Sequence, residues 1–345
     1  MVESQPHQVR DKFNRPIRDL RISVTDRCNF RCVYCMPREV FGPGYAFVPR
    51  SELLRLEEIH RVARIFVQEG VTKIRITGGE PLIRRDLEQL IEMISGIDGI
   101  RDLSMTTNAS MLTLERARSL YGAGLARINI SLDALDQETF QEINDVKFPV
   151  SDVLSGIDNA LATGFSNVKI NSVIRKGSND HSILDLARHF RGSGATLRFI
   201  EFMDVGSTNQ WQREQVMPAS KMIDIIKTEF PIAPVSPNYE GEVAKRWRYL
   251  DGSGEIGFIT SVTQPFCRDC SRARISAVGK IYTCLFASNG HDLKDLIREG
   301  ASDAVLARFV REIWSNRIDR YSELRSDASL TRDSAARIEM SYIGG

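Results

Sequence analysis

The chain has 345 residues, a length typical of about two folding units. Hydrophobic residues make up 42% and charged residues 26%, an ordinary globular composition that argues against disorder and collagen-like repeats. The 46 basic and 45 acidic side chains give a formal net charge of +1, so nothing indicates binding to DNA, RNA or a membrane surface, which needs an excess of basic charge. No apolar run reaches the ~18 residues of a membrane span, and residues 1–10 lack the apolar core of a signal peptide. We therefore expect a cytoplasmic protein.

Apolar periodicity predicts alternating strands and helices through the first two thirds of the chain. The expected strands are 18–24, 73–76, 100–106, 127–131, 168–174 and 197–202, and the expected helices are 51–70, 86–95, 113–121, 138–143, 153–163 and 182–190. This rhythm implies parallel strands joined by crossover helices, because parallel neighbours need a long return connection. Six such units fall short of the eight in a closed barrel.

We therefore predict an α/β fold built on a partial TIM-type (β/α)6 barrel, with a smaller C-terminal α+β region as a second unit. The expected division is an N-terminal tail (1–15), the partial barrel (16–205) and the C-terminal region (206–345).

The six cysteines form two triplets, and no cysteine lies outside them. The first is Cys28, Cys32 and Cys35, and the second is Cys267, Cys270 and Cys284. Each tight group has an odd number of thiols, which argues against a disulfide framework in a long chain without a signal peptide. Clustered cysteines in a reducing compartment more often bind metals as thiolates.

The first triplet has the spacing C-x3-C-x2-C and follows the first expected strand, where barrel active sites are built. Three thiolates can fill three corners of a [4Fe–4S] cluster, whose complete protein ligation uses four. One iron is then open to a small ligand, and the amino and carboxylate groups of S-adenosylmethionine can chelate it. A zinc site with a distant fourth ligand is the alternative.

With this triplet the chain resembles the radical S-adenosylmethionine superfamily, whose signature has an aromatic residue before the last cysteine, here Tyr34. Gly78-Gly79-Glu80-Pro81 follows the second strand and resembles the superfamily's loop that contacts the methionine amino group. Ser131 and Met203 follow the fourth and sixth strands at ligand-facing ends. Taken singly, each has a simpler interpretation, a turn cap for Ser131 and a core residue for Met203.

The second triplet has the spacing C-x2-C-x13-C, which fits a zinc ribbon lacking one cysteine equally well. Arg272 and Arg274 stand between its ligands and project from one face of an extended strand. Guanidinium groups on one face suit phosphate oxygens, to which they donate paired hydrogen bonds. A solvated arginine pair is the alternative, weakened by the metal-ligand candidate immediately before it.

The combination is similar to the GTP 3′,8-cyclase family of molybdenum-cofactor biosynthesis, over residues 15–345. The matching segments are 21–28, 75–82, 198–203, 257–259, 284–286 and 343–345. The resemblance implies a lyase with two [4Fe–4S] clusters that converts GTP to (8S)-3′,8-cyclo-7,8-dihydroguanosine 5′-triphosphate. S-adenosylmethionine would provide a 5′-deoxyadenosyl radical that removes hydrogen from ribose C3′.

The resemblance also implies residue roles, with the first triplet holding the S-adenosylmethionine cluster and the second triplet the other cluster. S-adenosylmethionine contacts would be Tyr34, Gly79, Ser131 and Met203. The GTP site would be Arg21, Arg75, Thr106, Lys169, Arg272, Ala273 and Arg274. Catalytic roles would fall to Arg21, Arg272, Arg274, Gly344 and Gly345, the last two through a tail that we expect to reach into the channel. The chain departs from the family pattern at Ala109, usually glycine, and at Ser271, usually asparagine.

The implied partners are a flavodoxin- or ferredoxin-like electron donor and a downstream cyclic pyranopterin monophosphate synthase, with a homodimer as one option for assembly. Two alternatives compete with this interpretation. A peptide-modifying radical S-adenosylmethionine maturase with an auxiliary cluster usually carries more C-terminal cysteines. A noncatalytic zinc-binding interaction protein would contain zinc in place of iron and acid-labile sulfide.

Overall fold

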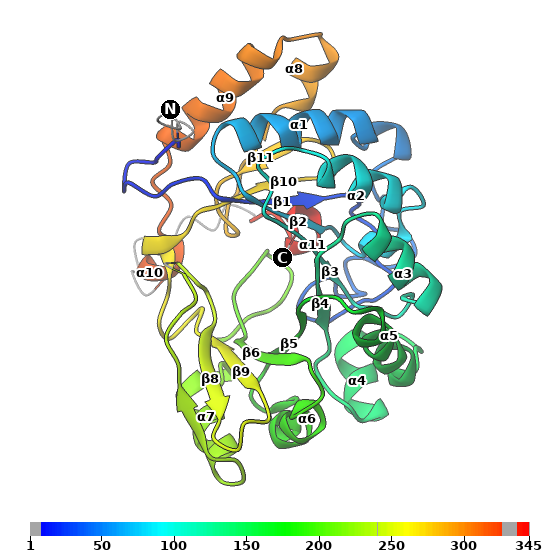
Figure 1. Cartoon of the computed structure of the whole chain (residues 1–345), viewed down its shortest axis with the longest axis vertical. Coiled ribbons are helices and arrows are strands. Elements are labelled where there is room, and N and C mark those ends of the chain that lie inside the picture. Colours follow the sequence, from blue (N-terminus) through cyan, green and yellow to red (C-terminus); the bar gives the residue numbers. More distant parts are fainter. Residues whose placement is uncertain (1–7, 240, 326–336, 345) are drawn as a thin grey trace.

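The computed structural model describes residues 8–239, 241–325 and 337–344, and it contains one curved sheet with helices on its outer face (Figure 1). The strand order is β12-β11-β10-β1-β2-β3-β4-β5-β6-β9-β8-β7. The strands are β1 (Asp19–Ser23), β2 (Lys73–Thr77), β3 (Asp102–Thr107), β4 (Arg127–Ser131), β5 (Val168–Ile174), β6 (Thr196–Glu201), β7 (Ile232–Pro234), β8 (Lys245–Tyr249), β9 (Glu255–Ile259), β10 (Arg272–Ile275), β11 (Lys280–Tyr282) and β12 (His291–Asp292).

The helices include one after each of the first strands, as crossover connections require. The α-helices are α1 (Leu56–Gln68), α2 (Leu87–Ser95), α3 (Leu114–Gly122), α4 (Gln137–Asn144), α5 (Val150–Thr163), α6 (Ile183–Phe190), α7 (Ala219–Lys227), α8 (Lys294–Arg298), α9 (Asp303–Ser315), α10 (Tyr321–Leu324) and α11 (Met340–Ile343). The short 3-10 helices are η1 (Arg50–Glu52), η2 (Pro81–Ile83), η3 (Asp180–Ser182), η4 (Arg213–Gln215) and η5 (Cys267–Asp269). Among the described residues, no helix has the length and apolar character that crossing a bilayer requires.

All neighbours from β10 through β1–β6 to β9 are parallel, whereas β11, β12, β8 and β7 extend the two edges with antiparallel pairs. The sheet order ends at β12 and β7 without joining them, so the barrel is open, and the predicted partial barrel is confirmed. The C-terminal strands belong to the same sheet, because β10 pairs with β1 and β9 pairs with β6. The C-terminal region thus completes the wall of the barrel.

The core lies between the helices and the outer face of the sheet. In α1, Ile59, Val62 and Phe66 recur at helical spacing and are buried against this face. In β5 the burial alternates along the strand, which turns every second side chain toward the inside of the barrel. In β5 the polar Lys169 and Asn171 therefore face the barrel interior, whereas Ser172 is buried on the outer face.

The helix expected from residue 51 is wrong at its start. Residues 50–52 form η1, and α1 begins only at Leu56. The Leu54 amide donates to the Ala277 carbonyl, so it is not available for a hydrogen bond within a helix, and residues 53–55 are not helical. Glu58 then caps the helix by accepting from the Arg55 amide at 2.8 Å.

The segment before β1 is packed into the structure. Val9 and Asp11 are buried, and the Lys12 amide donates to the Arg317 carbonyl, just beyond α9. Inside the curve of strands, α11 lies beside β1, close to the end of the chain (Figure 1). Segments near both ends of the chain thus pack against the barrel.

Candidate functional site

The first cysteine triplet lies on the loop after β1, where its three thiols are free and partly buried. The Cys32 thiol donates to Asn144 Oδ1 at 3.0 Å, and the Phe30 amide donates to Cys28 Sγ at 3.4 Å. Burial, followed by the charge of Glu80, raises the pKa of the Cys28 thiol to about 12. Burial and the neighbouring Cys28 and Cys35 raise the pKa of Cys32. Thiols crowded in this way lose their protons when a metal binds.

The donor set of this loop fits an iron–sulfur cluster with one open iron. It contains three thiols, the ligand type of such clusters, and lacks the fourth that complete ligation would need. In the described part of the chain, no group of three or more His, Cys, Asp or Glu side chains is arranged to hold a single metal ion. The fit therefore rests on the chemistry of the donors rather than on a closed mononuclear geometry.

The loop after β2 is pressed against the cysteine loop. A Cβ on Gly79 would overlap the Arg27 carbonyl oxygen and lie 2.5 Å from its carbon, so only glycine fits. The next residue, Glu80, is buried and accepts from Thr107 Oγ1 at 2.6 Å and from the Asn108 amide at 2.7 Å. The ends of β1, β2 and β3 are thereby joined into one rigid rim.

The other predicted S-adenosylmethionine contacts lie at the same edge of the sheet. Tyr34 donates to Asp133 Oδ2 at 2.7 Å, and Asp133 lies two residues beyond Ser131, the last residue of β4. The Val173 amide donates to Asp133 Oδ1 at 2.8 Å, and burial raises the pKa of this carboxyl to about 6. Met203 follows β6 at the corresponding strand end. The rim therefore presents aromatic, hydroxyl and thioether groups around the first triplet.

In the second triplet, Cys267 begins η5, Cys270 directly follows η5, and Cys284 lies in the turn after β11. Two guanidinium groups donate to the sulfur of Cys270, that of Arg272 at 3.4 Å and that of Arg317 at 3.3 Å. Burial alone would raise the pKa of Cys270, but Arg272 and Arg317 lower it to about 6. By contrast, burial and then Asp319 raise the pKa of Cys284 to about 12. The three free thiols again form a donor set suited to a cluster with one open iron.

Three arginines stand side by side inside the barrel between the two triplets. In the strand register Arg21 of β1 lies opposite Arg274 of β10 on one side and Arg75 of β2 on the other. Burial, followed by Arg274 and Arg75, lowers the pKa of Arg21. Burial and Arg272 lower the pKa of Arg274 to about 9. Arg274 is buried and Arg21 and Arg75 are partly buried, so these like charges repel one another with little screening by water, and an anionic ligand would offset that repulsion.

The C-terminal segment reaches this arginine row. The Arg274 guanidinium donates to the Gly344 carbonyl at 2.7 Å in a buried contact, and Ile343 is fully buried. Gly344 has a φ of 75°, and a Cβ there would overlap the Thr77 methyl group at the end of β2. The expectation that the tail enters the barrel is met for Gly344, whereas Gly345 lies outside the described residues.

Comparison with known proteins gives concordant results along the whole chain. Residues 22–190 match the radical SAM superfamily, and residues 195–323 match the family described as Molybdenum Cofactor Synthesis C. The GTP 3′,8-cyclase of Acidothermus cellulolyticus is 51% identical, covering 98% of this chain and 99% of that protein. The enzyme of the same name from Staphylococcus epidermidis is 50% identical at the same coverage.

The chain belongs to the GTP 3′,8-cyclase family. The family predicted from the cysteine triplets and the terminal glycines is thus confirmed. Among solved structures, Streptococcus suis SuiB aligns with a TM-score of 0.62 at 14% identity, covering 88% of this chain and 67% of that one. This likeness concerns the fold alone.

In this member of the GTP 3′,8-cyclase family, the structure shows what the departure at Ala109 costs and how the turn is held. Ala109 is buried and has a φ of 57°, a left-handed conformation that costs a residue with a Cβ about 1–2 kcal/mol. Glycine avoids that cost, which accounts for the family preference. The Thr107 hydroxyl accepts from the Ala109 amide at 2.9 Å and stabilises the turn in this chain.

Ser271, the second departure, ties the second triplet to the first strand. Its hydroxyl donates to Asp19 Oδ2 at 2.9 Å, and its carbonyl accepts from the amides of Arg18 and Asp19. The connection between β10 and β1 therefore survives the loss of the usual asparagine.

Further family-site candidates lie deeper in the barrel. The buried Thr106 hydroxyl has no hydrogen-bond partner among the described residues, which leaves it available to a ligand. Burial, followed by Arg198, lowers the pKa of Lys169 to about 7. The Ala273 side chain is buried in the apolar core, opposite in direction to the flanking arginines, so only its main chain can face the site.

Arg198 is a candidate that the sequence analysis did not select as a site residue. It donates to Asn171 Oδ1 at 2.9 Å and to Asn129 Oδ1 at 2.8 Å, and burial lowers its pKa to about 9. An arginine flanked by the apolar Leu197 and Phe199 in an expected strand was the available signal. It indicates a cation facing the barrel interior.

Proposed function

We propose that this chain is a radical S-adenosylmethionine lyase that converts GTP to (8S)-3′,8-cyclo-7,8-dihydroguanosine 5′-triphosphate in molybdenum-cofactor biosynthesis. The observation that carries the proposal is the row Arg274–Arg21–Arg75, in which Arg274 is buried and the other two are partly buried, and which Gly344 touches. A site with this much buried positive charge suits a triphosphate, which brings several negative charges. The relationship to GTP 3′,8-cyclases over the full chain supports the same substrate.

In this proposal each triplet holds a [4Fe–4S] cluster. Cys28, Cys32 and Cys35 hold the one that binds S-adenosylmethionine, which the residues at the strand ends surround, namely Tyr34, Gly79, Ser131 and Met203. When bound, the reduced cluster and S-adenosylmethionine supply a 5′-deoxyadenosyl radical that takes hydrogen from ribose C3′. Cys267, Cys270 and Cys284 hold the second cluster, which faces the guanine.

The protein's part in this chemistry is to bind, orient and exclude water. Arg21, Arg75 and Lys169 would hold the phosphates, Thr106 would use its unpartnered hydroxyl, and the Ala273 main chain would line the site. The proposed catalytic residues are Arg21, Arg272, Arg274, Gly344 and Gly345. Rigid placement matters because an organic radical otherwise attacks the nearest C–H bond.

The proposal predicts that GTP binding takes up a proton through Lys169. Burial and the nearby Arg198, Arg127 and Arg75 lower its pKa to about 7, opposed only weakly by Glu242. Phosphate groups would favour the ammonium form and raise this pKa. Affinity should therefore be greatest below pH 7 and fall as the pH rises, by up to ~10-fold per pH unit.

Calorimetry of GTP binding at pH 8, in two buffers of different ionisation enthalpy, measures this proton uptake. The Lys169→Met variant distinguishes proton uptake by Lys169 from proton exchange by GTP itself, because only the latter remains in the variant. We expect less proton uptake in the variant than in the natural chain, and equal uptake would contradict the role of Lys169.

The proposed reaction itself is tested by anaerobic reconstitution with iron and sulfide, followed by mass spectrometry of the nucleotide formed from GTP and S-adenosylmethionine. The expected product has the same mass as GTP, because ribose C3′ loses one hydrogen atom, the C3′–C8 bond forms, and the resulting base radical gains one electron from the reductant and one proton from solvent. Fragmentation must therefore place the new bond between ribose and base. Unchanged GTP beside a modified peptide would favour a peptide-modifying maturase.

Four further proposals accompany the family assignment. The electron donor is a flavodoxin- or ferredoxin-like protein, and the product passes to a cyclic pyranopterin monophosphate synthase. A cytoplasmic location agrees with six free cysteines, which persist in a reducing compartment. A homodimer is the proposed assembly, to be measured by the mass of the protein in solution.

A further inference from the structure

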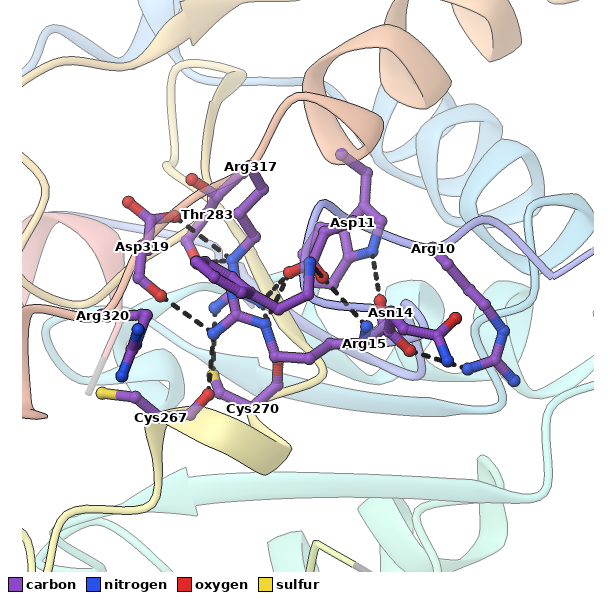
Figure 2. Close-up of polar contacts among 12 residues, drawn as sticks. Arg10, Asp11, Asn14, Arg15, Cys267, Cys270, Thr283, Arg317, Asp319 and Arg320 are labelled. Carbon is purple, nitrogen blue, oxygen red and sulfur yellow. Dashed lines mark hydrogen bonds and ion pairs between the residues drawn. The ribbon is translucent and has the colours of Figure 1, made fainter.

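A buried group of charged residues surrounds the main chain of the second cysteine triplet. It consists of Asp11, Arg15 and Arg317, which we call the Asp11 cluster (Figure 2). Asp11 Oδ2 accepts from Arg15 Nε at 2.6 Å and from Arg317 Nη1 at 3.2 Å. The Asp11 side chain has no exposed surface, and those of Arg15 and Arg317 are 3% and 1% exposed.

The two arginines reach the surroundings of every cysteine in the triplet. Arg15 Nη1 donates to the Cys267 carbonyl at 2.7 Å. Arg317 donates to the Cys270 carbonyl at 2.7 Å and, through Nε, to the carbonyl of Thr283, the residue before Cys284, at 3.1 Å. The Asp11 cluster therefore fixes the η5 segment and the turn before Cys284 relative to each other.

Arg317 also contacts a proposed ligand atom directly, because Nη2 donates to Cys270 Sγ at 3.3 Å. Two further contacts orient the Arg317 guanidinium. Asp319 accepts from Nε at 3.2 Å, and the Trp314 ring centre lies 4.6 Å from the guanidinium carbon. Figure 2 shows these contacts converging on one planar guanidinium. A lysine could not make them together, because it has a single charged nitrogen in place of the planar fork.

Burying such a group is costly unless its charges are paired and its donors are satisfied. A scaffold that only had to close the barrel could use apolar residues at these positions. Here the charges hold the carbonyls beside three thiols and direct a positive donor at one of them. That arrangement suits the support of a negatively charged metal centre, since groups beyond the ligands orient the ligands and tune the metal.

We propose that Asp11, Arg15 and Arg317 position the second cysteine triplet for its cluster, with Arg317 stabilising the negative sulfur of Cys270. The inference rests on the proposed function, because it assumes that this triplet holds the second [4Fe–4S] cluster. Hydrogen bonds to the sulfurs favour the more negative, reduced state of a cluster and so raise its reduction potential. Loss of Arg317 should therefore lower the potential and loosen the metal.

The test uses the full chain with Cys28→Ala, Cys32→Ala and Cys35→Ala, so that only the second triplet can hold iron. In this parent, Arg317→Gln is expected to shift the midpoint potential to more negative values and to release iron to a chelator about tenfold faster. Arg317→Lys, which keeps the charge, should recover part of the potential. The matched control is Arg311→Gln, whose exposed arginine pairs with Glu69 and should change neither readout.

Asp11→Asn is a second, independent variant, in which the new side chain has a similar shape to the original one. It allows the proposal to be tested even if Arg317→Gln does not fold. It weakens the hold on both arginines, so we expect faster iron release and a potential shifted in the same direction. Unchanged potential and iron release in the folded variants would overturn the positioning role alone. A parent that takes up no iron and sulfide would instead contradict the second cluster, and this inference with it.

Discussion

Gly344→Ala is expected to lower cyclisation by about 100-fold while leaving iron and sulfide content unchanged. The added Cβ would overlap the Thr77 methyl group, and the φ of 75° disfavours any residue other than glycine. The tail would then shift away from Arg274, whose guanidinium donates to the Gly344 carbonyl at 2.7 Å. Turnover of GTP under anaerobic conditions, together with iron analysis, measures both effects.

Gly300→Ala is the matched control for this substitution. Gly300 has a φ of 84°, but a Cβ there would meet no atom within 4 Å. It therefore reproduces the backbone strain without the contact at the site, and its turnover should stay close to that of the natural chain. Equal activity of both variants would contradict a role of the tail in the reaction.

Gly79→Ala is expected to abolish activity through loss of the first cluster. Its Cβ would overlap the Arg27 carbonyl oxygen and lie 3.1 Å from the Cys28 amide nitrogen, so the cysteine loop must move. Overpacking of this kind costs about 1–3 kcal/mol of the free energy of unfolding. We expect iron to be retained only at the second triplet, as measured by iron analysis and electron paramagnetic resonance.

Gly122→Ala serves as the control for Gly79→Ala. Gly122 lies at the end of α3, and a Cβ there would meet nothing within 4 Å. Alanine favours the helix by up to about 1 kcal/mol, so this variant should keep full iron content and unfold no more easily. Normal iron loading of Gly79→Ala would show that the close approach of the two loops is not needed for the first cluster.

Local patterns were sufficient to predict the barrel strands, and they also single out the cysteines that we propose as cluster ligands. The strands 127–131 and 168–174 are observed with the predicted bounds, because their apolar residues alternate with polar ones inside the barrel. The start of α1 was harder to predict, since the Leu54 amide bonds to Ala277, which is distant in sequence. A contact of this kind leaves no periodic signal.

Some site residues could likewise be predicted from local patterns, whereas others come together only through contacts between distant segments. The cysteine spacing and the pair Arg272 and Arg274 are local, and the sequence points to them directly. The row that Arg274 forms with Arg21 and Arg75 depends on strand order, because β10 joins the sheet beside β1. The Asp11 cluster depends on two segments about 300 residues apart, so neither Asp11 nor Arg317 carries a recognisable signal in the sequence.

The origin of the hydrogen acquired by 5′-deoxyadenosine tests the central claim most directly. The account places ribose C3′ of GTP beside S-adenosylmethionine, between the rim of the first triplet and the arginine row. With GTP carrying deuterium at C3′, mass spectrometry of the reconstituted, reduced enzyme should find that deuterium in 5′-deoxyadenosine. Formation of unlabelled 5′-deoxyadenosine during GTP turnover would contradict it.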